Sequence, residues 1–136
     1  MKISVSTTVK SDLPTVWKCW SNPADIRQWN AASDDWHTTD SHVDLRVGGK
    51  FSARMEAKNG SMGFNFTGTY SKIIEPALIE YTMDDNRVVS IAFVDVEGGV
   101  QITETFDADD EYDIEHQREG WQSILNHFTS YVEAKA

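Results

Sequence analysis

Apolar and polar residues alternate along much of the chain, which is the pattern of strands that bury one face. The alternation begins with Ile3, Val5, Thr7 and Val9 and returns between about residues 34 and 107, where Gly-Gly, Asn-Gly and Asp-Asn pairs interrupt it. Such interruptions are turn signals, so we expect consecutive antiparallel strands joined in a meander. The expected segments are residues 3–9, weak strands or extended loop at 36–39 and 43–47, and strands at 50–57, 62–74, 78–83, 88–96 and 100–106.

Two short helices are expected directly after the first strand. Ser11 is placed to cap the first helix, and Pro14 falls in its first turn, where a missing N–H costs little. Asn22 is placed to cap the second, which begins at Pro23 and ends near Trp29.

The C-terminal quarter of the chain has the spacing of one long amphipathic helix. Apolar residues from about Asp110 to Glu133 recur every three or four positions, which predicts a helix roughly 35 Å long. An acidic run over residues 107–115 lies where we expect this helix to begin, and the helix dipole favours negative charge there. A single antiparallel sheet needs its apolar face covered. The long helix is the one predicted element that can do so, and a space between it and a curved sheet is expected.

Composition narrows the class of protein. The chain has 136 residues, which predicts one domain over 1–136, and 40% of the residues are hydrophobic. A net charge of −10 argues against partners that are themselves anionic, such as nucleic acid or a lipid surface. No apolar stretch approaches the length of a membrane span, the first residues lack a signal-peptide run, and Cys19 is the single cysteine. We therefore expect a cytoplasmic protein without membrane insertion.

Several short motifs follow one another in an order that resembles a known family. They are Val16-Trp17, Asn22-Pro23-Ala24 before Trp29, a D-x-R-x-G-G signature within residues 43–51, Gly68–Ile73 leading to Glu75-Pro76 and 78–82, and Gly120-Trp121 before Leu125 and Phe128. Together they resemble the activator of Hsp90 ATPase homologue 1-like (AHSA1-like) family, within the START-like or Bet v 1-like (SRPBCC) superfamily. The resemblance covers almost the whole chain. Where many members carry a second Trp and a Pro after the position of Trp29, this chain has Asn30-Ala31-Ala32.

The resemblance implies an α+β helix-grip fold. In that fold an antiparallel sheet of six or seven strands wraps around the long C-terminal helix and leaves a cavity between them. Relatives bind lipids, sterols, polyketides or other hydrophobic molecules, some are cyclases or aromatases, and eukaryotic relatives help to stimulate the Hsp90 ATPase. The leading hypothesis is therefore a non-catalytic binding protein for a small hydrophobic molecule, without a cofactor. The alternatives are a chaperone-interacting module with a role in the stress response, and a cyclase- or aromatase-type enzyme.

The strand faces and the helix stripe supply the candidate residues for such a cavity. Trp29 and Trp36 flank the least regular stretch of the chain, and we expect them at the cavity rim. The same apolar residues would serve equally well in a filled core, because a sequence shows which way side chains face and not whether a space remains. The expected lining residues are Phe51, Met55, Phe64, Phe66, Tyr81, Phe93, Trp121, Leu125 and Phe128.

The sequence indicates candidate polar and catalytic residues less clearly than it indicates the apolar lining. Glu104 and Asp95 alternate in phase with apolar neighbours, so each is either an internal polar group or a strand-end residue in solvent. Acid–base catalysis by these two, Tyr81 or His37 would need two groups that converge on the cavity, and no motif marks such a pair. The histidines match no metal-binding spacing, and no nucleophile or phosphate-binding motif occurs. We assign no catalytic residue and no metal site.

Overall fold

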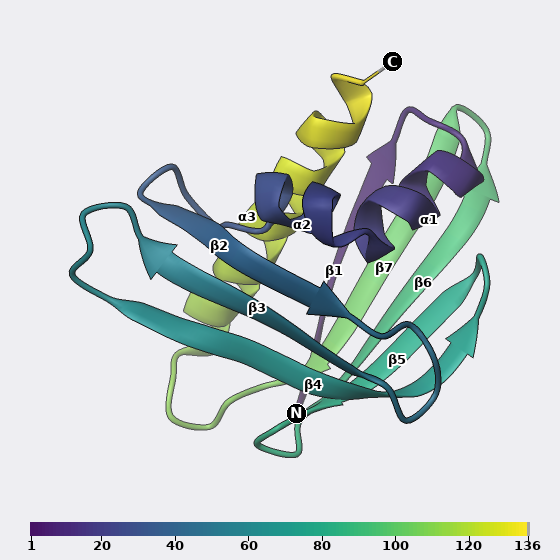
Figure 1. Ribbon diagram of the computed structural model, residues 1–136. Helices are drawn as coiled ribbons and strands as arrows, with labels where there is room; N and C mark the ends of the chain where they lie inside the picture. The colour runs from purple at the N-terminus through teal and green to yellow at the C-terminus, as the bar shows by residue number, and fades with distance from the viewer. Residues whose placement is uncertain (136) are drawn as a thin grey trace.

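The computed structural model describes residues 1–135, and seven strands in it form one curved antiparallel sheet (Figure 1). Their order across the sheet is β1-β7-β6-β5-β4-β3-β2, so the first two strands of the chain lie at opposite edges. From β2 to β7 each strand pairs with the next, as a meander predicts. The strands are β1 (Lys2–Val9), β2 (Trp36–Val43), β3 (Lys50–Ala57), β4 (Gly63–Ile74), β5 (Leu78–Met83), β6 (Val88–Val96) and β7 (Gly99–Asp107).

Three helices cover the inner face of this sheet. The short helices α1 (Leu13–Ser21) and α2 (Pro23–Trp29) connect the two edge strands, and α2 packs on β2. The long helix α3 (Ile114–Glu133) lies along β1 and touches α1 and α2 (Figure 1). The predicted α+β helix-grip arrangement is thereby confirmed. None of the described helices is both long enough and apolar enough to cross a membrane.

Side-chain caps fix where the two short helices begin. The prediction that Ser11 caps α1 was wrong by one residue, because the Asp12 carboxylate accepts the Thr15 backbone N–H at 2.8 Å. The prediction for α2 is confirmed, since the Asn22 side chain accepts the Ala24 N–H at 3.2 Å and Pro23 follows at the first helical position.

The long helix starts later than its sequence pattern suggested. Asp113 is its N-cap and accepts the His116 backbone N–H at 3.0 Å, so most of the acidic run lies in the loop before the helix. The 20 residues of α3 span about 30 Å rather than 35 Å. A buried side chain stabilises this loop, because the Gln117 amide bonds the backbone of Asp109 and Tyr112.

The region between residues 36 and 47 also differs from expectation. The two weak strands expected there are one strand, β2, and residues 44–47 lie outside it. A register shift between Thr38 and Asp40 marks a β-bulge. A bulge reverses the alternation of side chains, so Thr38 and Ser41 both point inward although they are three residues apart.

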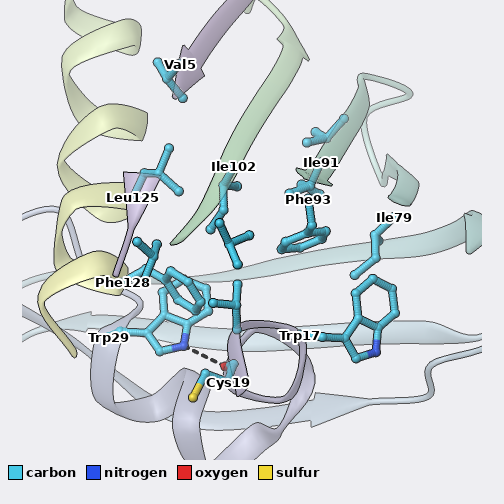
Figure 2. Close-up of a cluster of buried hydrophobic side chains, with 14 of the residues drawn as sticks. Val5, Trp17, Cys19, Trp29, Ile79, Ile91, Phe93, Ile102, Leu125 and Phe128 are labelled. Carbon is cyan, nitrogen blue, oxygen red and sulfur yellow. Dashed lines mark hydrogen bonds between the residues drawn. The ribbon is translucent and has the colours of Figure 1, made fainter. Parts of the chain in front are cut away.

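Aromatic side chains from all three helices and the sheet form the core between them. The Trp20 ring lies 4.9 Å from both the Trp29 and the Phe128 ring, mostly in edge-to-face arrangements. Figure 2 shows Leu125 and Phe128 on α3 beside Ile102, with Trp29 below them. The Trp29 indole N–H donates to the Cys19 carbonyl at 3.0 Å, which satisfies its one polar atom inside the core.

The substitution Phe128→Ala tests how much this cluster holds the helices to the sheet. Phe128 is fully buried, so we expect the free energy of unfolding to fall by about 3–5 kcal/mol. Urea unfolding followed by tryptophan fluorescence measures the loss. The matched control is Val94→Ala, because Val94 is 52% exposed on the outer face and should cost much less. Equal losses in the two variants would contradict the placement of Phe128.

Candidate ligand-binding cavity

A cavity of about 310 Å³ lies between the inner face of the sheet and the three helices. Its walls come from β2 to β5, from β7, from the last two residues of α1 (Trp20 and Ser21), and from α2 and α3, and most of the side chains that line it are apolar. In another protein an apolar cavity of about 150 Å³ holds a benzene molecule. The space here is therefore sufficient for a small organic molecule with more than one ring.

Four aromatic rings on β3, β4 and β5 form one wall. The Phe51 ring centroid lies 4.6 Å from that of Tyr81, 5.4 Å from Tyr70 and 5.7 Å from Phe66. Gly68 makes this packing possible, because it pairs opposite Phe51 and a Cβ there would lie 2.7 Å from the Phe51 ring. The wall is therefore a close-packed aromatic surface. The rings fit together because β4 has a glycine, without a side chain, opposite Phe51.

The helices form the opposite wall. Trp121 and Ile124 on α3 face the cavity together with Ile26 and Trp29 on α2. The Trp121 ring is stacked on that of Phe106 at 3.9 Å, with an angle of 11° between the planes. This stacking fixes one face of Trp121 against β7, and the ring edge lies near Phe66, with 6.3 Å between centroids.

The nine candidate lining residues separate into two groups in the structure. Phe51, Met55, Phe64, Phe66, Tyr81 and Trp121 line the cavity. Phe93, Leu125 and Phe128 do not, because they are buried in the hydrophobic core (Figure 2). On α3 the periodicity could not separate Trp121 from Leu125 and Phe128, since one apolar stripe faces the filled core along part of its length and the cavity along the rest.

The two tryptophans expected at the rim occupy different places. Trp29 lines the cavity, but it is only 6% exposed and its hydrogen bond to Cys19 anchors it inside. Trp36 lies in a second surface depression between α2, β2 and α3. Phe64 links the two regions, because it lines the cavity, is 47% exposed and contacts the Trp36 ring at 5.8 Å. Phe64 is therefore one of the cavity residues that reach the protein surface.

Glu104 is the acidic residue of the cavity wall. It is 6% exposed, and its neighbours across the sheet, Val5 on β1 and Ile91 on β6, are buried apolar residues. Burial raises the pKa of Glu104 to about 8. At neutral pH its carboxyl group is therefore mostly uncharged and can both donate and accept a hydrogen bond. Burial likewise raises the pKa of Tyr81 well above its usual range, and the nearby Glu104 adds to that shift.

Two hydroxyl groups of the cavity lining are also unsatisfied. Within residues 1–135, the Oγ atoms of Ser21 and Ser41 are buried without a hydrogen-bond partner. Sequence reasoning missed Ser41 because the β-bulge turns it inward at a position that simple alternation does not mark. Tyr70 lines the cavity beside Phe51, on the sheet face where its alternation with Phe64 and Phe66 predicts it.

The other acid–base candidates do not join Glu104 and Tyr81. Asp95 is exposed near the end of β6, and His37 lines the second depression. No group of three or more His, Cys, Asp or Glu side chains in residues 1–135 is arranged to hold a metal ion. The cavity chemistry visible here is aromatic surface with a few unsatisfied hydrogen-bonding groups.

Comparisons with known proteins place this architecture in a family. A curved antiparallel sheet around a C-terminal helix, with a cavity between them, defines the helix-grip class of fold. Residues 11–133 match the family model "Activator of Hsp90 ATPase homolog 1-like protein", and the chain belongs to that family, as its motifs predicted. No match to a curated protein was found.

Solved structures agree with this assignment. The AHSA1-like protein of Aeromonas hydrophila is 47% identical, with a TM-score of 0.94 over 99% of this chain and 94% of its own. A protein of Cytophaga hutchinsonii is 43% identical, with a TM-score of 0.85 over 98% of this chain and 93% of its own. A protein of Chromobacterium violaceum is 20% identical with a TM-score of 0.88 over 98% of each chain, which shows the shared fold alone.

The pH dependence of stability tests the burial of Glu104. An unfolded Glu titrates near pH 4.3, whereas the folded one titrates at about 8. Between those values the folded protein holds the extra proton, so its stability is full at low pH and falls by up to about 1.4 kcal/mol per pH unit as pH rises. We expect Glu104→Gln to lack this slope and to gain stability relative to the wild type between pH 6 and pH 8.5.

Urea unfolding at several pH values measures the difference. The matched control is Glu80→Gln, because Glu80 lies on β5 outside the cavity lining and should keep the wild-type pH profile. Parallel profiles for the wild type and Glu104→Gln would show that Glu104 is not desolvated.

Proposed function

We propose that this protein binds a small, mainly apolar organic molecule, such as a lipid fragment, polyketide or aromatic compound, in the cavity between the sheet and α3. The observation that carries the proposal is a cavity of about 310 Å³ in which aromatic walls meet unsatisfied buried polar groups. Ligand sites have this composition in general, with mostly apolar walls and a few polar groups that orient the bound molecule.

The geometry favours binding over structural packing for a physical reason. Interiors of proteins are close-packed, and an unfilled apolar space of this size forfeits contacts that side chains would otherwise make. Ser21 and Ser41 add the cost of buried hydroxyl groups without partners. A bound molecule would recover both terms, whereas a protein that acted only through its outer surface would gain nothing from the cavity.

A chaperone-interacting role is the second candidate, and the support for it is the family description itself. Such a role would require an outer surface that recognises the chaperone, and the cavity would be incidental to it. The two candidates therefore make opposite predictions about a variant in which the cavity is filled.

The substitution Ile124→Trp fills the cavity from α3, since Ile124 is half-buried and lines it. We expect the wild type to bind the neutral fluorescent probe N-phenyl-1-naphthylamine saturably, and the variant to bind it at least about tenfold more weakly. The matched control Val94→Trp adds the same side chain at an exposed position outside the cavity and should bind like the wild type.

Native mass spectrometry of freshly purified protein complements the probe. Extra mass that disappears on denaturation, and that is absent from Ile124→Trp, supports the proposal and gives the mass of the natural ligand. A bare chain together with no probe binding by the wild type would contradict it. Equal probe binding by the wild type and Ile124→Trp would contradict this location.

A further inference from the structure

We propose that the ligand is an aromatic alcohol or phenol whose uncharged hydroxyl group hydrogen-bonds to the Glu104 carboxyl group inside the cavity. This inference rests on the proposed function and specifies the chemistry of the molecule that the cavity accepts.

The position of Glu104 provides the first reason. Its side chain lies on the inner face of β7 between Val5 and Ile91, and it lines the cavity. Burial raises its pKa, and no side chain or backbone group of residues 1–135 forms a hydrogen bond or an ion pair with its carboxyl group. A buried carboxyl group without a partner costs free energy that a leucine at the same place would not. A ligand group that pairs with it would remove that cost.

The charge of the site decides which ligand group fits. A carboxylate on the ligand would lose its hydration beside another carboxyl group. An amine would form a buried ion pair with Glu104, and apolar walls offer no further hydrogen bonds to offset the desolvation of the two charges. Arg87 and His42 line the cavity as well, but the Arg87 guanidinium already contacts the Asp85 carboxylate at 2.7 Å, and His42 Nε2 lies 3.1 Å from the Asp40 carboxylate. A hydroxyl group suits a neutral carboxyl group best, because each of the two can donate to the other and accept from it.

The remaining walls decide the body of the ligand. Phe51, Phe66 and Trp121 present ring edges and faces from both sides of the cavity. Aromatic pairs of this kind contribute beyond the area that they bury, which favours a planar ring system over a flexible chain. A flexible chain would also lose more conformational entropy on binding.

Three probes of one shape test the inference: naphthalene, 2-naphthol and 2-naphthoate, titrated calorimetrically at pH 6.5. In the wild type we expect 2-naphthol to bind about 2- to 10-fold more tightly than naphthalene, which corresponds to the net contribution of one hydrogen bond. We expect 2-naphthoate to bind most weakly. In Glu104→Leu the preference for 2-naphthol should disappear while naphthalene binding is retained or improved.

The matched control is Glu80→Leu, which removes a carboxyl group outside the cavity lining and should keep the wild-type preference. Retained naphthalene binding shows that Glu104→Leu is folded, and Glu104→Met replaces it if it is not. An unchanged preference for 2-naphthol in Glu104→Leu would overturn the inference. So would tighter binding of 2-naphthoate than of 2-naphthol, because Arg87 would then select the ligand. Failure of all three probes with a wild type that binds N-phenyl-1-naphthylamine would also overturn the inference, whereas failure of all four probes would contradict the proposed function.

Discussion

The structure depends on a mismatch in size between the sheet and the helices that cover it. Seven strands present more inner surface than one 20-residue helix can cover, and the two short helices add to the cover without completing it. Because α3 lies along β1 and α2 packs on β2, the helices cover the edges of the sheet and meet over one part of it. Where the helices cross the sheet without packing closely on it, the space between them is the cavity.

The close-packed aromatic core stabilises the fold enough for a cavity to remain beside it. Trp20, Trp29 and Phe128 pack ring against ring and join α1, α2 and α3 into one body. Large aromatic side chains bury much area each, so these three stabilise the helix–sheet junction, and Trp20 and Trp29 also form the part of the cavity wall next to it. The stability of the fold therefore depends less on close packing among the other cavity residues, and polar groups are tolerated among them.

The sequence predicts the elements well and the cavity only in part. Alternation and turn pairs locate β3, β5 and β6 to the residue, because half-buried strands have a period that a single sequence displays. The bulge in β2 hides the inward position of Ser41, since it breaks that period. Phe128 and Trp121 share one helical stripe, yet one is core and the other faces the cavity. Their difference arises from tertiary geometry, which no local spacing contains.

Glu104 is the residue at which local rules and the observed structure disagree most. The strand pattern places an ionisable side chain among Val100, Ile102 and Phe106, where an apolar residue would stabilise the fold more. Positions that violate local rules without a structural gain are the ones where function is expected to compensate. The same burial that makes the carboxyl group costly also keeps it uncharged near neutral pH, which is the state in which it can share hydrogen bonds with a neutral molecule in an apolar cavity. The cost to stability and the capacity for recognition thus have one physical cause, the low polarity of the surroundings of Glu104.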